Sequence, residues 1–268
     1  MTGCLWLIGG TQESRVLAEA IGAAGRPCVV TVATARAAAL YSQAQGVVVV
    51  SGGLTAADLD AFQARFALCG ILDASHPHAA AVSELAIQAA RCWGIPYLRY
   101  ERPAVTTDSD AGQQGFADMA ALLRTANLTG QRVLFTVGYR ALPLLKAWQT
   151  QATLFARILP SPTALETALA AGFSPERLVA LWPPVPYALE KALWQQWQIT
   201  AVVTKAAGRP GGEAIKRQLA QEMGVHLWVI GRPAVAYPAQ TQDLDQALSF
   251  ALRVTGQTSL GQPIRPLN

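Results

Sequence analysis

Short apolar runs alternate with stretches of helical periodicity along the whole chain. In the first half, runs that are apolar without alternation predict buried strands at 4–9, 28–33, 47–51, 70–74 and 95–100. Apolar positions three and four residues apart predict helices between these strands, at 12–24, 35–44, 55–67, 79–93 and 115–126. Regular alternation of strands and helices with short loops is typical of a parallel, doubly wound sheet in an α/β protein.

The same alternation fills the second half of the chain. It predicts strands at 132–136, 153–158, 178–182, 200–204 and 225–230, and helices at 139–149, 161–171, 186–197, 212–223 and 242–254. A loop-like segment at 104–114 separates the two halves, and residues 256–268 have the composition of a loose tail. The sequence therefore predicts two related α/β domains, residues 1–128 and residues 129–268.

Composition narrows the classes of protein that the chain can belong to. The apolar runs are too short to span a membrane, and no signal peptide is visible at the N-terminus. The four cysteines form no C-x-x-C pair, which favours reduced core residues in a cytoplasmic protein. No metal site and no interaction with a membrane is expected.

Charge is distributed unevenly between the two halves. Residues 1–128 carry 8 Arg and 10 acidic residues, whereas residues 129–268 carry 9 Arg, 4 Lys and 7 acidic residues. A basic second half suits an anionic small molecule. Because no Lys/Arg run and no alternation of basic and aromatic residues occurs, the sequence does not indicate nucleic-acid binding.

The first predicted strand leads into a turn suited to a phosphate. Gly9 and Gly10 permit turn geometry and close approach of a ligand, and Thr11 can cap the helix that follows. Glu13 lies in the first turn of that helix. A helix N-terminus after a glycine turn offers free N–H groups to a phosphate, although the third glycine of the G-x-G-x-x-G pattern is missing. The alternative is an ordinary tight turn.

The second predicted strand is followed by Thr34 and Arg36, and no acidic residue occurs between Glu19 and Asp58. A dinucleotide fold contacts the adenosine ribose at this place, where an acid favours NAD and an arginine accommodates the 2′-phosphate of NADP. The pattern therefore favours NADP if a nucleotide binds. A solvated arginine that opens a helix is the alternative.

The fourth predicted strand ends in the most unusual local sequence of the chain. Asp73, Ser75, His76 and His78 occur within six residues, with Pro77 near the start of the next helix. We interpret this segment as the wall of a ligand pocket; the alternative is a capped helix start with incidental histidines. The two histidines lack a nearby Cys or Glu that would complete a metal site.

Basic residues follow several other strands. Arg99 and Arg102 can bind a carboxylate or a phosphate through two N–H groups, although an Arg–Glu pair with Glu101 at the surface is the alternative. In the second half, Tyr139 and Arg140 follow another turn of small residues. Further on, the glycine-rich stretch 205–216 contains three cations and forms an anion-facing loop: Lys205, Arg209 and Lys216.

Taken together, these segments resemble the precorrin-6A reductase family of cobalamin biosynthesis, including its cobalt-precorrin form. The resemblance spans nearly the whole chain and is carried by 9–13, 73–77, 98–103, 136–138, 205–212 and 232–233. It implies two Rossmann-like domains with NADPH and the substrate in a cleft between them. It also implies hydride transfer to one double bond of the macrocycle. His78, Ala104, Val105, Ala206 and Ala207 depart from residues common in the family.

The resemblance and the residue patterns together assign roles. Residues expected at the NADPH site are Gly9, Gly10, Thr11, Glu13, Thr34, Arg36 and Ser75. Hydride transfer mainly requires orientation and exclusion of water, and a tetrapyrrole polycarboxylate needs cationic partners. Residues expected at the substrate are Asp73, Arg99, Arg102, Arg140, Lys205 and Lys216. His76, Tyr139 or water would supply the proton, and Asp73 could orient His76.

Two other classes of function fit the same patterns. One is a non-catalytic module that binds NADPH or a tetrapyrrole, and the other is a transferase that uses a nucleotide-linked donor. A monomer or a small homo-oligomer is expected in either case. Consumption of NADPH in the presence of precorrin-6A separates the reductase from both alternatives.

Overall fold

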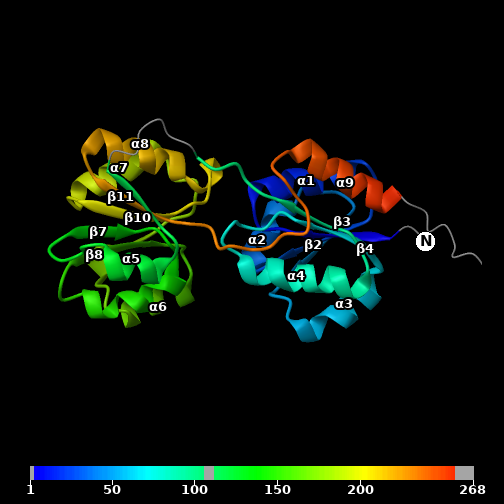
Figure 1. Ribbon diagram of the computed structural model, residues 1–268, viewed down its shortest axis with the longest axis horizontal. Coiled ribbons are helices and arrows are strands. Elements are labelled where there is room, and N and C mark those ends of the chain that lie inside the picture. The colour runs from blue at the N-terminus through cyan, green and yellow to red at the C-terminus, as the bar shows by residue number, and fades with distance from the viewer. Residues whose placement is uncertain (1–2, 106–111, 257–268) are drawn as a thin grey trace, which may run out of the picture. The chain divides into compact units, whose positions relative to one another are not determined.

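The computed structural model describes residues 3–105 and 112–256 (Figure 1). The chain divides into two units. Unit 1 comprises the chain up to Arg102 together with the residues from Ala234 onward, and unit 2 comprises Pro103–Pro233. Each unit is built around its own parallel sheet of six strands.

The sheet of unit 1 has the strand order β12-β5-β4-β1-β2-β3, and every pair of neighbours is parallel. Its strands are β1 (Cys4–Ile8), β2 (Cys28–Val32), β3 (Val47–Ser51), β4 (Leu68–Asp73), β5 (Tyr97–Tyr100) and β12 (Gln240–Thr241). The strands β1, β2 and β4 are buried almost throughout, because helices cover both faces of a parallel sheet.

Helices cover both faces of this sheet. One face packs against α1 (Gln12–Ala23) and α9 (Leu244–Gly256), and the other packs against α3 (Leu59–Phe66) and α4 (Ala80–Trp93) (Figure 1). The short elements are α2 (Ala35–Ala38), η1 (Ala39–Tyr41) and η2 (Ala56–Asp58). Side chains of β1 alternate between the two cores, since Leu7 packs on the α1 side and Trp6 on the α4 side.

Unit 2 repeats this architecture with the strand order β6-β11-β10-β7-β8-β9. Its strands are β6 (Gln113–Phe116), β7 (Arg132–Phe135), β8 (Thr153–Ile158), β9 (Leu178–Ala180), β10 (Ala201–Lys205) and β11 (His226–Ile230). One core is formed with α5 (Met119–Thr125), η3 (Tyr139–Trp148) and α6 (Pro162–Ala170). The other is formed with α7 (Tyr187–Gln196) and α8 (Glu213–Met223). The remaining short 3₁₀ elements of this unit are η4 (Pro175–Arg177) and η5 (Arg209–Gly211).

The two units exchange their outermost strands. β6 follows the strands of unit 1 along the chain but pairs with β11 of unit 2, and β12 follows unit 2 but pairs with β5 of unit 1. Unit 1 thereby acquires the 3-2-1-4-5-6 order of a Rossmann fold. Unit 2 has the same spatial arrangement, except that the sixth place is taken by β6, which is the first strand of that unit along the chain. The boundary predicted between residues 128 and 129 differs from this division, because residues 113–128 belong to unit 2 and residues 234–256 to unit 1.

Several predicted helices differ from the structure. The helix predicted at 35–44 is the four-residue α2 followed by the 3₁₀ helix η1, and the helix predicted at 55–67 begins as the 3₁₀ helix η2 before α3. The helix predicted at 115–126 begins only at Met119, because residues 113–116 form β6. The helix predicted at 139–149 is the 3₁₀ helix η3, which contains Pro143; a proline cannot donate the backbone hydrogen bond of an α-helix interior. Nearly all of the predicted tail at 256–268, and part of the predicted loop at 104–114, lie outside the described residues.

Candidate functional site

The strand order of each sheet reverses at one point, and doubly wound folds bind ligands beyond the carboxyl ends of the strands at such a point. The reversal lies between β1 and β4 in unit 1, and between β7 and β10 in unit 2. The segments that follow these four strands define one candidate site in each unit: 9–11 and 74–78 in unit 1, and 136–140 and 206–212 in unit 2.

The two glycines after β1 have different physical roles. A Cβ on Gly9 would lie 2.2 Å from the Tyr41 hydroxyl and 2.8 Å from Val30, so no larger residue fits without a shift of these neighbours. Gly10 has a φ of +99°, and nothing lies within 4 Å of the place where its Cβ would be. Gly10 therefore leaves the backbone open to a ligand. Sequence analysis did not find Tyr41, because it lies 31 residues from Gly10 and no local pattern marks it.

The N-terminus of α1 is held by a reciprocal cap. Thr11 Oγ1 accepts from Ser14 N at 3.1 Å, and Ser14 Oγ accepts from Thr11 N at 3.0 Å. Thr11 Oγ1 also donates to the carbonyl oxygen of Ala74 at 2.8 Å, which ties the helix to the segment after β4. In the described part of the chain, the backbone N–H groups of Gln12 and Glu13 have no acceptor, as expected for the first turn of a helix. They are available to an anion.

Asp73, at the end of β4, organises a buried polar network. Its Oδ1 accepts from Ser75 N at 3.0 Å and from Arg99 Nη1 at 2.9 Å. Its Oδ2 accepts from Ser83 Oγ at 2.6 Å and from Tyr97 OH at 2.7 Å. Burial, followed by the charge of Asp73, raises the pKa of Tyr97 and keeps its hydroxyl protonated. The network fixes the start of the segment that carries the two histidines.

Arg99 is enclosed within this network. Its Nη1 also donates to Ser75 Oγ, its Nε donates to Glu101 Oε2 at 2.9 Å, and its guanidinium lies over the ring of Tyr237. Burial acts to lower the pKa of Arg99, but the carboxylates of Asp73 and Glu101 outweigh it, so the pKa is raised. Because the guanidinium is only 1% exposed, Arg99 presents no N–H group to a ligand in this structure.

Arg102 and Glu13 form an ion pair in which both nitrogens of the guanidinium fork meet the carboxylate, at 2.6 and 2.7 Å. The sequence predicts Glu13 at the nucleotide and Arg102 at the substrate. The structure brings the two together beside the first turn of α1, and both assignments stay predictions.

His76 and His78 lie side by side with their ring centroids 5.8 Å apart. The Nδ1 of His76 accepts a hydrogen bond from the backbone N of His78 at 3.2 Å. A neutral imidazole that accepts at Nδ1 carries its proton at Nε2, so His76 can donate a proton from Nε2.

The end of β2 carries the predicted 2′-phosphate residues. Thr34 caps α2 by accepting from Ala37 N at 3.2 Å, and Arg36 is exposed on the same short helix. Arg36 is the only Lys or Arg between residues 33 and 43, all of which the structure describes.

In unit 2, the carboxyl ends of β7 and β10 bring two basic residues near each other. Lys205 is the last residue of β10, and burial together with the charge of Arg140 lowers its pKa. The guanidinium of Arg140 lies 5.8 Å from the ring centre of Tyr139. Three of the predicted residues, Tyr139, Arg140 and Lys205, thus gather at the reversal point of this sheet.

Lys216 lies deeper in unit 2, on α8, and is only 2% exposed. Its Nζ donates to the carbonyl oxygen of Gly212 at 3.2 Å, and it lines a small cavity with Arg157 and Glu190. Burial and the charge of Arg157 lower the pKa of Lys216 to about 8. Sequence analysis missed Arg157 and Glu190, which form an ion pair here across 33 residues of sequence.

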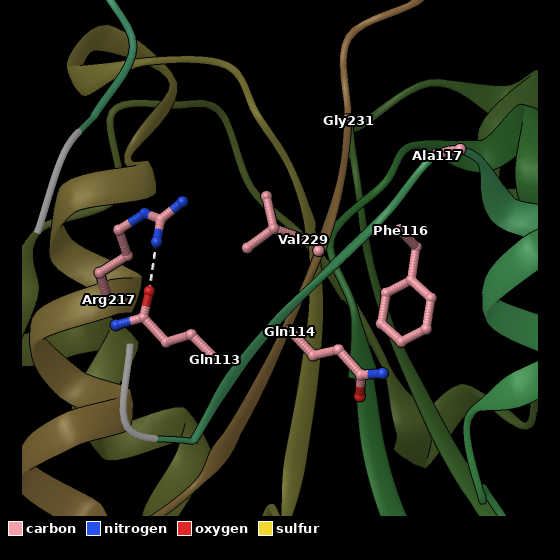
Figure 2. A pocket seen from close by; sticks show the side chains of 8 residues that line it. Gln113, Gln114, Phe116, Ala117, Arg217, Val229 and Gly231 are labelled. Atoms are coloured by element: carbon pink, nitrogen blue, oxygen red, sulfur yellow. Dashed lines mark hydrogen bonds between the residues drawn. The ribbon is translucent and has the colours of Figure 1, made fainter. Parts of the chain in front are cut away.

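A cavity of about 480 Å³ lies along the edge strand β6 of unit 2 rather than at either reversal point. Figure 2 shows Gln113 of β6 and Arg217 of α8 pointing toward one another across it, joined by a hydrogen bond. None of the predicted site residues lines this cavity.

Residues 3–105 and 112–256 contain no cluster of three or more His, Cys, Asp or Glu side chains placed to hold a metal ion. None of the helices within these ranges is long and apolar enough to cross a membrane.

Fold and site together define an α/β protein with two Rossmann-like parallel sheets, which has an open glycine corner at the reversal point of unit 1 and two basic residues at that of unit 2. The model of the family described as "Precorrin-6x reductase CbiJ/CobK" matches residues 4–251. The chain belongs to this family. It is therefore an oxidoreductase of cobalamin biosynthesis that acts on a CH–CH bond of the corrin ring.

Individual relatives agree with this assignment. A cobalt-precorrin-6A reductase from Synechocystis sp. is 45% identical over 252 residues, which cover 93% of this chain and 96% of that protein. A cobalt-precorrin-6A reductase from Priestia megaterium is 32% identical, with 86% and 91% covered. The solved structure of CobK precorrin-6A reductase matches with a TM-score of 0.77 and 26% identity, covering 96% of this chain and 98% of that one. The family resemblance and the α/β fold predicted from the sequence are confirmed.

Proposed function

We propose that this chain reduces cobalt-precorrin-6A or precorrin-6A with NADPH as the hydride donor. The observation that carries the proposal is the open glycine corner and helix N-terminus at the reversal point of unit 1, in a chain of the precorrin-6x reductase family. The two relatives described above are named for the cobalt form, so this form is the first substrate to test.

The residues of unit 1 fit a nucleotide. Gly10 leaves room beside the backbone, and the N–H groups of Gln12 and Glu13 suit a pyrophosphate at the helix N-terminus. Arg36 provides a cation for a 2′-phosphate, and the segment that follows β2 contains no carboxylate that would repel it. Thr34 and Ser75 flank this surface from the ends of β2 and β4. These features support NADPH over NADH.

NADPH, when bound, supplies a hydride to one carbon of a macrocycle double bond, and the neighbouring carbon takes up a proton. The chain holds and orients the reacting groups, and it holds the proton. His76 carries a donor proton at Nε2, and its backbone position depends on the network of Asp73. Tyr139 is the second candidate proton donor.

Substrate carboxylates require cations that are not already neutralised. Arg140 and Lys205 lie at the reversal point of unit 2 and are the first residues that we assign to carboxylate binding. Lys216 is a third candidate, reached only if the cavity around it opens. Arg99 and Arg102 are engaged by carboxylates of the chain itself, so we propose that they, with Asp73, shape unit 1 rather than contact the substrate.

The direct test incubates the purified protein with cobalt-precorrin-6A and NADPH that carries deuterium at the transferred position. The expected result is loss of the NADPH absorbance and a product that carries one deuterium and one solvent proton. A protein that binds both molecules without this change would be the non-catalytic module considered above. Conversion that needs a nucleotide-linked donor instead would identify a transferase.

The cofactor assignment has its own test. Arg36→Ala removes the proposed partner of the 2′-phosphate, and a hydrogen bond to a charged group contributes about 1.5–3 kcal/mol. We expect the Kd for NADPH to rise by about tenfold or more and the Kd for NADH to stay within about twofold. Arg65→Ala, on α3 of the same unit, is the control and should change neither value. Equal effects of Arg36→Ala on the two nucleotides would remove the 2′-phosphate assignment.

A further inference from the structure

Tyr41 lies directly against the glycine corner although it comes from a different part of unit 1. Its hydroxyl accepts from the backbone N of Gly10 at 2.7 Å and is 2.6 Å from Ser14 Oγ. The same hydroxyl occupies the space where a Cβ of Gly9 would lie, 2.2 Å away. One side chain therefore contacts both glycines and the first turn of α1.

The hydrogen bonds around Tyr41 have a single consistent direction. Ser14 Oγ donates to the carbonyl oxygen of Thr11 at 2.7 Å, so the Tyr41 hydroxyl is the donor to Ser14. Its oxygen then accepts from Gly10 N, and every group in the chain of bonds is satisfied. Burial raises the pKa of Tyr41, so the hydroxyl keeps the proton that this arrangement needs.

Tyr41 is also the anchor of the segment that carries Arg36. Between residues 33 and 43, all of which the structure describes, Tyr41 is the only buried side chain, at 3% exposure. The helix α2 has four residues and none of them is buried. Its successor η1 ends at Tyr41, whose ring packs in the core formed with α1 and α9. Ala37, Ala38 and Leu40 are only partly buried against the same core, so Tyr41 gives the segment 33–43, which carries Arg36, its one fully buried contact.

We propose that Tyr41 is a positioning residue that couples the phosphate corner at Gly10 to the 2′-phosphate residue Arg36, and thereby sets the preference for NADPH over NADH. The inference rests on the proposed binding of the nucleotide to unit 1. It goes further by assigning cofactor specificity to a buried side chain that contacts neither the substrate nor, in this geometry, the solvent. In this proposal the hydroxyl of Tyr41 fixes the position of Arg36 relative to the corner at Gly10.

Tyr41→Phe isolates this hydroxyl, because the ring stays in the core. The variant removes the acceptor of Gly10 N and the donor to Ser14. A water molecule in the vacated space could replace those bonds, but it would not be attached to η1. The corner serves both nucleotides, whereas Arg36 serves only NADPH. The loss of affinity should therefore be larger for NADPH.

The experiment measures the Kd for NADPH and for NADH by isothermal titration calorimetry with the full chain. We expect Tyr41→Phe to weaken NADPH binding about tenfold and NADH binding no more than about threefold. The kcat at saturating NADPH and substrate should stay within about twofold, because the residue positions the cofactor and touches no reacting atom. The control Tyr187→Phe removes a hydroxyl bonded to Glu222 on unit 2 and should change neither Kd.

The possible outcomes separate this inference from the proposed function. A wild-type chain that binds neither nucleotide overturns both. A wild-type chain that prefers NADPH, with a Tyr41→Phe variant whose ratio of the two Kd values is unchanged, overturns the coupling alone. A ratio of the NADPH Kd to the NADH Kd that rises in Tyr41→Phe and stays unchanged in Tyr187→Phe supports the coupling.

Discussion

Glu13 and Arg102 meet through two parallel N–H···O contacts, with Arg102 Nε 2.6 Å from Glu13 Oε1 and Nη2 2.7 Å from Oε2. Glu13 lies in the first turn of α1, and Arg102 lies just beyond β5. The pair therefore joins the glycine corner, Gly9–Thr11, to the end of another strand of the sheet. It also neutralises a carboxylate that would otherwise repel a phosphate at the same helix N-terminus.

The Glu13–Arg102 pair should stabilise unit 1 measurably. The two side chains are only 11% and 8% exposed, so water and salt screen their attraction weakly. A double-mutant cycle with Glu13→Gln and Arg102→Met should give a coupling free energy of about 1.5–3 kcal/mol in urea unfolding. The Arg15–Glu19 pair, whose side chains are about one-third exposed, should give about 0.5 kcal/mol or less. Equal coupling in the two cycles would contradict this account.

Asp73 should be among the least replaceable polar residues of unit 1. Its carboxylate accepts from Ser75 N, Arg99, Ser83 and Tyr97 in a fully buried place. In Asp73→Asn an amide group would face donors, and the buried charge of Arg99 would keep only Glu101 as a carboxylate partner. We expect the free energy of unfolding to fall by about 3–5 kcal/mol. Ser83→Ala removes one of the four bonds and should cost about 1 kcal/mol. A similar loss in the two variants would show that the network is not cooperative.

The sequence predicted the central strands because each is a continuous apolar run, which is the expected pattern for strands buried on both faces. Of the four edge strands, β3 and β9 were predicted, whereas β6 and β12 escaped prediction for the opposite reason. β6 contains two glutamines and a glycine, and β12 has only two residues. Their pairing partners, β11 and β5, lie more than 100 residues away along the chain. The domain boundary could not be located without them.

The features of the candidate site also fall into two groups, those that local sequence rules predict and those that depend on residues far apart in the sequence. Gly9, Gly10 and Thr11 are adjacent in sequence, so the turn and its helix cap could be predicted from local rules. The environment of Arg99 could not, because Asp73 lies 26 residues away on a neighbouring strand. In the sequence Arg99 has the features of an anion-binding residue, whereas in the fold the carboxylates of Asp73 and Glu101 neutralise its charge. The contact of Tyr41 with Gly10 spans 31 residues and escaped for the same reason.

Lys216 should make the stability of the chain depend on pH in an identifiable way. Its pKa is about 8 in the folded chain and near the ordinary value of 10.5 when unfolded. Between these values the unfolded chain binds more protons, so the free energy of unfolding should rise with pH across this range. A difference of this size corresponds to roughly 2–4 kcal/mol in total. Burial raises the pKa of Cys28, and that thiol acts in the opposite direction.

The difference in the free energy of unfolding between Lys216→Met and the wild-type chain separates the contribution of Lys216 from that of the thiols, because both proteins contain the same cysteines. From about pH 7 to about pH 10.5 the stability of Lys216→Met relative to wild type should fall by roughly 2–4 kcal/mol, since the variant lacks the rise. Lys146→Met, at an exposed position of the same unit, should keep a constant difference. A constant difference for Lys216→Met as well would mean that Lys216 stays protonated in the folded chain.

Lys205 is the residue on which the substrate assignment of unit 2 can be tested most directly. Lys205 is the last residue of β10, at the reversal point of the sheet. Burial and the positive charge of Arg140 lower the pKa of Lys205, and no carboxylate counters them. Two cations therefore lie close together there. Such a site is stabilised by an anion. Lys205→Ala should raise the KM for the tetrapyrrole about tenfold, the size expected for one charge-assisted hydrogen bond, and leave the KM for NADPH unchanged. Lys205→Arg should recover part of the loss, and Lys146→Ala should change neither KM. An unchanged substrate KM in Lys205→Ala would place the carboxylates elsewhere on unit 2.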